Sequence, residues 1–200
     1  MNFIIASNNR GKLREFKELL NIELIPYRDI LGDINIEESG KTFKENALIK
    51  AREVYKRVGE GAIVISDDSG LSVPILNGEP NIYSARYAGE EATDRENLEK
   101  LIGKLKDMGV ERTEAYYTAS IALVGDFGEW TAHGWCFGEI IDSPKGKNGF
   151  GYDPIFIPYG YKKTFGELNK SVKKSISHRV KALENIKPII QMLISNNFIF

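Results

Sequence analysis

The sequence predicts an α/β fold built on a mixed β-sheet with helices on its faces. Apolar segments of strand length alternate with segments in which apolar residues recur every three or four positions, a pattern that places helices against a sheet. Residues 116–124 and 130–141 are rich in β-branched and aromatic residues, and Asp126-Phe127-Gly128 between them predicts a hairpin. The length of 200 residues fits one domain over 1–200, with room for two lobes.

The chain is predicted to open with a strand, a polar loop and a helix. Residues 3–6 form a short apolar run of strand length. After the loop, the apolar face of the first helix is formed by Leu13, Phe16, Leu19 and Leu20. This order puts the loop at the N-terminus of a helix.

A second helix and a buried strand follow. Thr42 and Glu45 have the spacing of a capping box, and apolar residues continue at helical spacing until Gly59. Residues 62–65 then read as a buried strand, which we expect to end in a polar loop that begins at Ser66.

The C-terminal half carries two more helix signals. Thr93 and Glu96 form a second capping box, and Gly109 is placed to end the helix that they open. The last helix begins near Ser177, and Pro188 should kink or divide it. The order of the strands in the sheet stays open at this level.

Composition narrows the classes of partner and location. The 27 basic and 28 acidic residues are mixed along the chain, which argues against a surface for nucleic-acid polymers, so an anionic ligand must be met locally. The single Cys136 cannot form an internal disulfide, which fits a reducing compartment, and we expect a cytoplasmic protein. The apolar run at residues 1–6 is too short for a signal peptide, and no run is long enough for a membrane span.

The first polar loop is a candidate phosphate site. Backbone N–H groups and the positive end of the helix dipole favour an anion at a helix N-terminus, and two basic side chains add charge. The loop consists of Ser7, Asn8, Asn9, Arg10, Gly11 and Lys12. It lacks the spacing of a P-loop, and a simple N-cap turn with solvated basic residues is the alternative.

Two pairs of carboxylates are candidate Mg²⁺ ligands. Glu37 and Glu38 precede the second helix, and Asp67 and Asp68 follow the buried strand. Mg²⁺ takes one or two protein carboxylates and completes its shell with water and phosphate oxygens, and a carboxylate beside it can accept a proton from water. Solvated loop charges are the alternative for the glutamates. The adjacent aspartates do not fit the Asp-x-Asp spacing of a haloacid-dehalogenase-type phosphatase.

Two C-terminal segments suit a purine base. The run 149–154 joins aromatic rings that can stack on a base with Asp153 and with glycines that permit close backbone approach. Burial of Phe150 and Tyr152 in the core is the alternative. The run 173–179 leads basic residues into a helix, which suits an anion or a carbonyl-rich ring.

Together these segments resemble the non-canonical purine nucleoside triphosphate pyrophosphatases, the inosine triphosphate pyrophosphatase or RdgB family. Seven blocks occur in order, and the set is far more specific than any one block. The blocks are Ser7-x-Asn9-x-x-Lys12, Glu38-Ser39-Gly40-x-Thr42-Phe43, Glu45-Asn46-Ala47, Asp67-Asp68-Ser69-Gly70-Leu71, Tyr83-Ser84-Ala85-Arg86-Tyr87, Phe150-Gly151-Tyr152-Asp153-Pro154 and Ile176-Ser177-His178-Arg179.

The resemblance implies an enzyme that uses Mg²⁺ to cleave ITP, dITP or XTP into the monophosphate and pyrophosphate. It implies an elongated mixed sheet with two lobes around an active-site cleft, usually in a homodimer. In the family, the loop that matches residues 7–12 wraps the phosphates. The carboxylates that match Glu38 and Asp68 serve the metal, and Asp68 matches the proton acceptor.

The resemblance also assigns the remaining substrate contacts. Ser69 and Lys173 match substrate-binding positions, with the spacing to His178 favouring Lys173 over Lys174, and Lys50 and Arg86 are further candidates. The base pocket matches Phe150, Gly151, Tyr152, Asp153, His178 and Arg179.

Base selection has a physical reason of its own. Hypoxanthine and xanthine present O6 as an acceptor, so donors from Arg179 and from backbone N–H groups would pair with it, whereas the 6-amino group of adenine would leave them unpaired. Such rejection can reach about 10⁴-fold.

Two other classes fit less well. Maf-like nucleotide pyrophosphatases open on a Ser-x-Ser-Pro-Arg-type loop that is absent here. A silent nucleotide-binding module would keep the base pocket and lose the metal carboxylates, yet Glu38 and Asp68 are both present.

Overall fold

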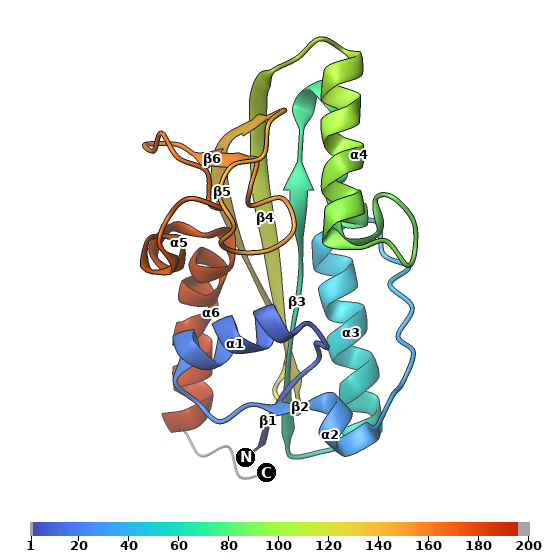
Figure 1. Cartoon of the computed structure of the whole chain (residues 1–200). Helices are drawn as coiled ribbons and strands as arrows, with labels where there is room; N and C mark the ends of the chain where they lie inside the picture. Colours follow the sequence, from blue (N-terminus) through green and yellow to red (C-terminus); the bar gives the residue numbers. More distant parts are fainter. Residues whose placement is uncertain (1, 196–200) are drawn as a thin grey trace. The chain divides into compact units, whose positions relative to one another are not determined.

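The computed structural model describes residues 2–195 and contains a mixed sheet, as predicted. Its strands are β1 (Asn2–Ile5), β2 (Ile25–Pro26), β3 (Ala62–Ser72), β4 (Arg112–Gly125), β5 (Gly128–Ile141) and β6 (Phe156–Pro158). They form one six-stranded sheet in the order β2-β1-β3-β4-β5-β6 (Figure 1). β1 pairs in parallel with β2 and β3, whereas β6 pairs antiparallel with β5.

Helices accompany the strands along the chain. They are α1 (Arg10–Leu20), α2 (Tyr27–Leu31), α3 (Phe43–Val58), α4 (Asp94–Asp107), α5 (Lys170–Ile176) and α6 (His178–Ser195). Two short 3₁₀ segments lie at Pro74–Leu76 and Asn81–Arg86. No helix among residues 2–195 has the length and apolar character needed to cross a bilayer.

The chain divides into two compact units. The first contains the chain up to Asp68, Ala119–Gly134 and the chain from Arg179 onward. The second contains Ser69–Thr118 and Trp135–His178. Each unit has a hydrophobic core of its own. A single domain over 1–200 stays a prediction.

The first unit buries both faces of its strands, and the alternation along β3 assigns each face to different helices. Ile63 and Ile65 join residues of α1 and α6 in one core cluster. Ala62 and Val64 join residues of α2 and α3 in another. Successive side chains of a strand point to opposite faces, so odd-numbered residues of β3 face α1 and α6 and even-numbered residues face α3.

The second unit is built around an aromatic core. The ring of Tyr117 on β4 contacts Phe156 at a centroid distance of 4.8 Å, edge to face, and Phe165 stacks on Phe156 at 5.3 Å. Leu101 and Leu105 of α4 complete this core.

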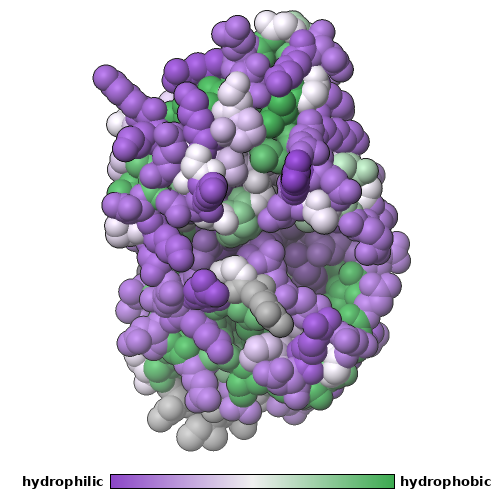
Figure 2. All heavy atoms as spheres, viewed as in Figure 1, coloured by the Kyte–Doolittle hydropathy of each residue, from purple (hydrophilic) through white to green (hydrophobic). Residues whose placement is uncertain are grey.

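On the view in Figure 2, hydrophilic residues cover most of the surface and hydrophobic atoms show in separate patches, in keeping with the balanced charge of the sequence.

Both helix caps predicted from the sequence are present, in different forms. Thr93 and Glu96 make the reciprocal capping box at α4. At α3 the N–H of Glu45 donates to Thr42 Oγ1 over 3.1 Å, but the Glu45 carboxylate accepts from the N–H of Lys41 over 2.6 Å instead. The second half of that box is therefore shifted by one residue.

Two predicted boundaries were wrong. β3 does not end before Ser66 but continues to Ser72. The run 173–179 was expected to lead into the last helix, but its first residues already belong to a separate helix, because Lys173 lies in α5. Of the two effects expected from Pro188, it does not divide the last helix, since α6 continues past it with Ile190 and Leu193 buried in the core, and a kink at this residue stays a prediction.

Candidate active site

The N-terminus of α1 is closed by its own cap. Asn9 accepts hydrogen bonds from the N–H groups of Gly11 and Lys12 over 2.8 and 3.1 Å. Ser7 in turn accepts from the N–H of Asn9 over 3.3 Å, and Asn8 donates to the hydroxyl of Tyr27. The expected loop is thus a capped helix start, and two N–H groups expected to face a phosphate are bound to Asn9.

The side chain of Arg10 lies outside the part of the chain that the structure describes. Its backbone begins α1, so Arg10, Gly11 and Lys12 stand in the first turn of the helix rather than in a loop.

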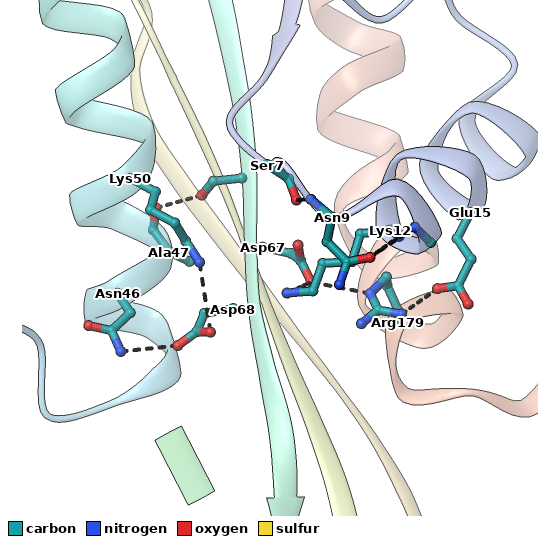
Figure 3. Close-up of polar contacts among 12 residues, drawn as sticks. Ser7, Asn9, Lys12, Glu15, Asn46, Ala47, Lys50, Asp67, Asp68 and Arg179 are labelled. Carbon is teal, nitrogen blue, oxygen red and sulfur yellow. Dashed lines mark hydrogen bonds and ion pairs between the residues drawn. The ribbon is translucent and has the colours of Figure 1, made fainter. Parts of the chain in front are cut away.

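Lys12 and Arg179 meet at Asp67. Lys12 Nζ lies 3.1 Å from Asp67 Oδ2, and Arg179 Nε donates to the same oxygen over 3.2 Å. Arg179 Nη1 also donates to Glu15 of α1, so one guanidinium joins two carboxylates (Figure 3). Burial opposes ionisation of Asp67, but Lys12 and Arg179 outweigh it and hold the pKa of the Asp67 carboxyl well below its usual range.

Asp68 has different partners. Asn46 of α3 donates to Asp68 Oδ2 over 3.1 Å, and Lys50, one turn further along α3, lies 3.7 Å from Asp68 Oδ1. Lys50 Nζ also lies 3.2 Å from Glu38 Oε1. Burial raises the pKa of the Asp68 carboxyl, while Asp68 and Glu38 outweigh the burial of Lys50 and raise the pKa of its ammonium.

The two adjacent aspartates therefore do not form a pair. Figure 3 shows Asp67 directed toward α1 and α6 and Asp68 directed toward α3, on opposite sides of β3. Strand alternation requires this once β3 runs through both residues. The repulsion expected from adjacent carboxylates is avoided, because each has cations on its own face.

Glu38 and Asp68 fit a divalent cation. Glu38 is half-buried and Glu37 is exposed, so only Glu38 reaches the ammonium shared with Asp68. Two hard carboxylate oxygens around one cation match the protein share of a Mg²⁺ shell. Among residues 2–195 no group of three or more His, Cys, Asp or Glu side chains is placed to hold a metal. Water and substrate oxygens would have to supply the other ligands.

The candidate base residues lie in the second unit, with the exception of Arg179. Asp153 accepts from the N–H of Phe150 over 2.9 Å and from Lys173, whose ammonium lies 4.6 Å from the centre of the Phe150 ring. A Cβ at Gly149 would lie 1.9 Å from Asp153 Oδ2, and its φ is +80°, so this turn requires glycine. Gly151, at φ +58°, also needs its conformational freedom.

Two of the candidate rings are buried in the second unit. Tyr152 packs in the aromatic core, and its hydroxyl donates to the carbonyl of Ser84 over 2.9 Å. The ring of His178, the first residue of α6, stacks on Tyr117 with centroids 4.7 Å apart and an interplanar angle of 8°. Phe150 is half-buried.

The other predicted substrate residues have these positions. Ser69 is half-buried in β3. Lys173 is 13% exposed and paired with Asp153, whereas Lys174 is exposed. Arg86 lies 3.7 Å from Glu90.

Sequence reasoning missed two residues of the site. Glu15 gives no local signal, because an acidic residue on an amphipathic helix normally faces water. Asn46 belongs to one of the seven blocks but was not predicted as a site residue. It is fully buried on α3 and accepts from the N–H of Gly40 over 2.8 Å. Its place one turn before Lys50 on the same helix face was the available signal.

The fold and the site define an α/β protein in which a buried and a half-buried carboxylate lie beside a basic helix residue. The chain matches the model of the Ham1 family over residues 3–189, and it belongs to this family.

Named relatives and solved structures are similar to this chain over nearly its whole length. A dITP/XTP pyrophosphatase of Sulfurovum sp. is 54% identical over 96% of this chain and 95% of its own, and one of Campylobacter jejuni is 46% identical over 96% and 98%. The Ham1 protein of Staphylococcus aureus superposes with a TM-score of 0.85 at 41% identity, covering 96% of this chain and 98% of that one. A Ham1 protein of Coxiella burnetii gives 0.87 at 40% identity, covering 96% and 99%.

Proposed function

We propose that the protein hydrolyses dITP, XTP and ITP to the monophosphate and pyrophosphate with Mg²⁺ as cofactor, and so removes deaminated purines from the nucleotide pool. The observation that carries this proposal is the arrangement of Glu38 and Asp68 around one cation, the ammonium of Lys50. The names of the relatives from Sulfurovum and Campylobacter support the substrate class.

The candidate site residues of the first unit have these roles in the proposal. Glu38 and Asp68 hold the metal, which when bound would polarise the phosphate oxygens and the attacking water. Asp68 accepts the proton of the water that cleaves the bond between the α- and β-phosphates. Ser7, Asn8, Asn9, Arg10, Gly11 and Lys12 are proposed to bind the phosphates. For Gly11 and Lys12, phosphate binding requires their backbone N–H groups to leave the side chain of Asn9 and donate to the substrate instead.

The proposal assigns base binding mainly to residues of the second unit. Asp153 and Lys173 form an ion pair, and the ammonium of Lys173 lies over the ring of Phe150. The ring and the two charges are thus held close together. Gly151, Tyr152 and His178 are the neighbouring candidates, and Ser69 is proposed as a further substrate contact. Arg179 is proposed to donate to O6 of the base through N–H groups of its guanidinium.

The test is a nucleotide panel. The protein is incubated with dITP, XTP, ITP, ATP and GTP in Mg²⁺, and pyrophosphate and orthophosphate are measured separately. We expect pyrophosphate and monophosphate from the first three nucleotides and loss of turnover on chelation of the metal. Orthophosphate as the primary product would contradict the proposal, and binding without turnover would favour a silent nucleotide-binding module.

We also propose a homodimer and a cytoplasmic location. The second unit exposes Phe137 and Tyr159 by 54% and 55%, side chains that a partner subunit could cover, and the single cysteine, Cys136, is buried. Light scattering on the purified protein tests the dimer, and Phe137→Ser with a monomeric mass would assign the interface to this face. A wild-type monomer would contradict it.

A further inference from the structure

Lys50 occupies a position between two carboxylates. Its Nζ lies 3.2 Å from Glu38 Oε1 and 3.7 Å from Asp68 Oδ1. The Lys50, Glu38 and Asp68 side chains are 12%, 27% and 9% exposed, so water screens these charges weakly. Figure 3 shows the side chain of Lys50 reaching from α3 to Asp68.

The carboxylate of Asp68 does not depend on Lys50 alone for its orientation. Asn46, one turn earlier on α3, donates to the other oxygen, Oδ2, over 3.1 Å. Asn46 is itself fixed, because its own Oδ1 accepts from the N–H of Gly40 over 2.8 Å. Oδ1 can therefore change partners while the carboxylate keeps its place.

An ammonium and a divalent cation compete for these two oxygens. A metal bound to Glu38 Oε1 and Asp68 Oδ1 would come within a few ångströms of the Lys50 ammonium, and two cations at that distance repel in a poorly hydrated site. The flexible side chain of lysine can move to relieve this, whereas the two carboxylates cannot separate without losing the metal.

We propose that Lys50 is an internal competitor of the metal: its ammonium holds the place of the divalent cation, leaves when the cation binds, and thereby sets the metal affinity of the protein. This inference rests on the metal site of the proposed function. It assigns to Lys50 a role in metal exchange that differs from a contact with the substrate.

The test measures metal binding in the absence of nucleotide. Mn²⁺ and Mg²⁺ are titrated by calorimetry into the wild type, Lys50→Met and the control Lys56→Met. Lys56 lies on the same helix and is exposed, and its replacement by Met removes the same charge. We expect Lys50→Met to lower the Kd for Mn²⁺ by at least ~5-fold, the lower end of typical coupling between sites, and Lys56→Met to leave it unchanged.

Two further variants keep the test decisive. Lys50→Gln keeps a polar side chain and covers the case in which Lys50→Met fails to fold, and it should also tighten the Kd for Mn²⁺. Glu38→Gln combined with Lys50→Gln should cancel the gain, because the metal then has one carboxylate fewer. In metal-free buffer the Lys50 variants should unfold at lower temperature than the wild type, and saturating Mn²⁺ should raise their Tm by more.

Several outcomes would overturn the inference. These are an unchanged or weaker Kd for Mn²⁺ in folded Lys50 variants, an equal gain in Lys56→Met, or no metal binding at all. Such a result leaves the proposed function standing if the wild type still releases pyrophosphate from dITP with Mg²⁺. Tighter binding in the Lys50 variants without any nucleotide hydrolysis by the wild type would instead contradict only the proposed function.

Discussion

Asp67 and Arg179 are 112 positions apart in the sequence, yet Arg179 Nε donates to Asp67 Oδ2 over 3.2 Å. Both side chains are almost completely buried, with residue exposures of 1% and 2%. The pair joins β3 to the start of α6, and Glu15 and Lys12 extend it to α1. A buried ion pair of this kind contributes little compared with an apolar replacement, but the loss of one partner is costly.

The first prediction concerns folding stability. Arg179→Ala removes a cation from two carboxylates at once, so we expect it to lower the free energy of unfolding by about 3–5 kcal/mol. Urea denaturation followed by circular dichroism measures this loss. Arg14→Ala is the matched control, because Arg14 is exposed on α1, and its effect should stay within about 0.5 kcal/mol. Equal effects of the two changes would show that the buried network adds nothing.

The second prediction concerns base selection. If Arg179 donates to O6, Arg179→Ala should lower kcat/KM for ITP by an amount equivalent to ~1.5–3 kcal/mol of transition-state binding free energy. The kcat/KM for ATP should fall much less. Glu15→Gln keeps the guanidinium and removes one of its carboxylates, so its ITP to ATP preference should stay close to that of the wild type. Steady-state kinetics on both nucleotides distinguish the two. A preference that survives Arg179→Ala would count against base reading by this residue.

The third prediction separates the two aspartates. Asp68→Asn should fold, because Asn46 can still donate to the remaining carbonyl oxygen, and should lose at least ~10²-fold in kcat. Thermal unfolding provides the control for folding, and pyrophosphate release provides the rate. Turnover near the wild-type level in folded Asp68→Asn would move the base elsewhere, with Asp67 as the next candidate.

The fourth prediction uses a close backbone contact. A Cβ at Gly40 would lie 2.6 Å from Asn46 Oδ1 and 2.9 Å from its backbone nitrogen. Gly40→Ala should therefore displace the amide that holds Asp68, with a loss of about 1–3 kcal/mol in stability and a lower kcat.

Gly103→Ala is the control for Gly40→Ala. Gly103 lies inside α4, and a Cβ there meets nothing within 4 Å. This change should stabilise the protein by about 0.5–1 kcal/mol. Activity of Gly40→Ala equal to that of Gly103→Ala would show that Asn46 does not position Asp68.

Local signals in the sequence predicted the elements well. The capping box at Thr93, the hairpin at Gly128 and the strand at residues 3–6 each depend on a few neighbouring residues, and all three are confirmed. The end of β3 could not be predicted in this way. Ser, Asp and Gly after Ile65 are poor strand formers, so the local signal indicates a loop.

Distant residues decide that boundary. Asp67 is tolerated in a buried strand because Lys12 and Arg179 balance its charge. Asp68 is tolerated because Lys50 balances its charge and Asn46 donates a hydrogen bond to it. None of these partners is near β3 in the sequence. For the same reason, the sequence could identify Asp68 as a site residue by resemblance but could not show which helix supports it.

The parallel pairing of β1 with β3 aligns Ile4 with Val64 and Ile5 with Ile65, and this alignment decides which helix each aspartate meets. Deleting Ser66, which lies between Ile65 and Asp67, would move each later residue of β3 to the opposite face of the sheet. Asp68 would then face Arg179, and Ser69 would face Lys50. A change in the length of β3 before Asp67 would therefore separate both aspartates from their partners at once, whereas a single substitution alters one contact. Libraries built to alter this protein should keep the length of β3 constant.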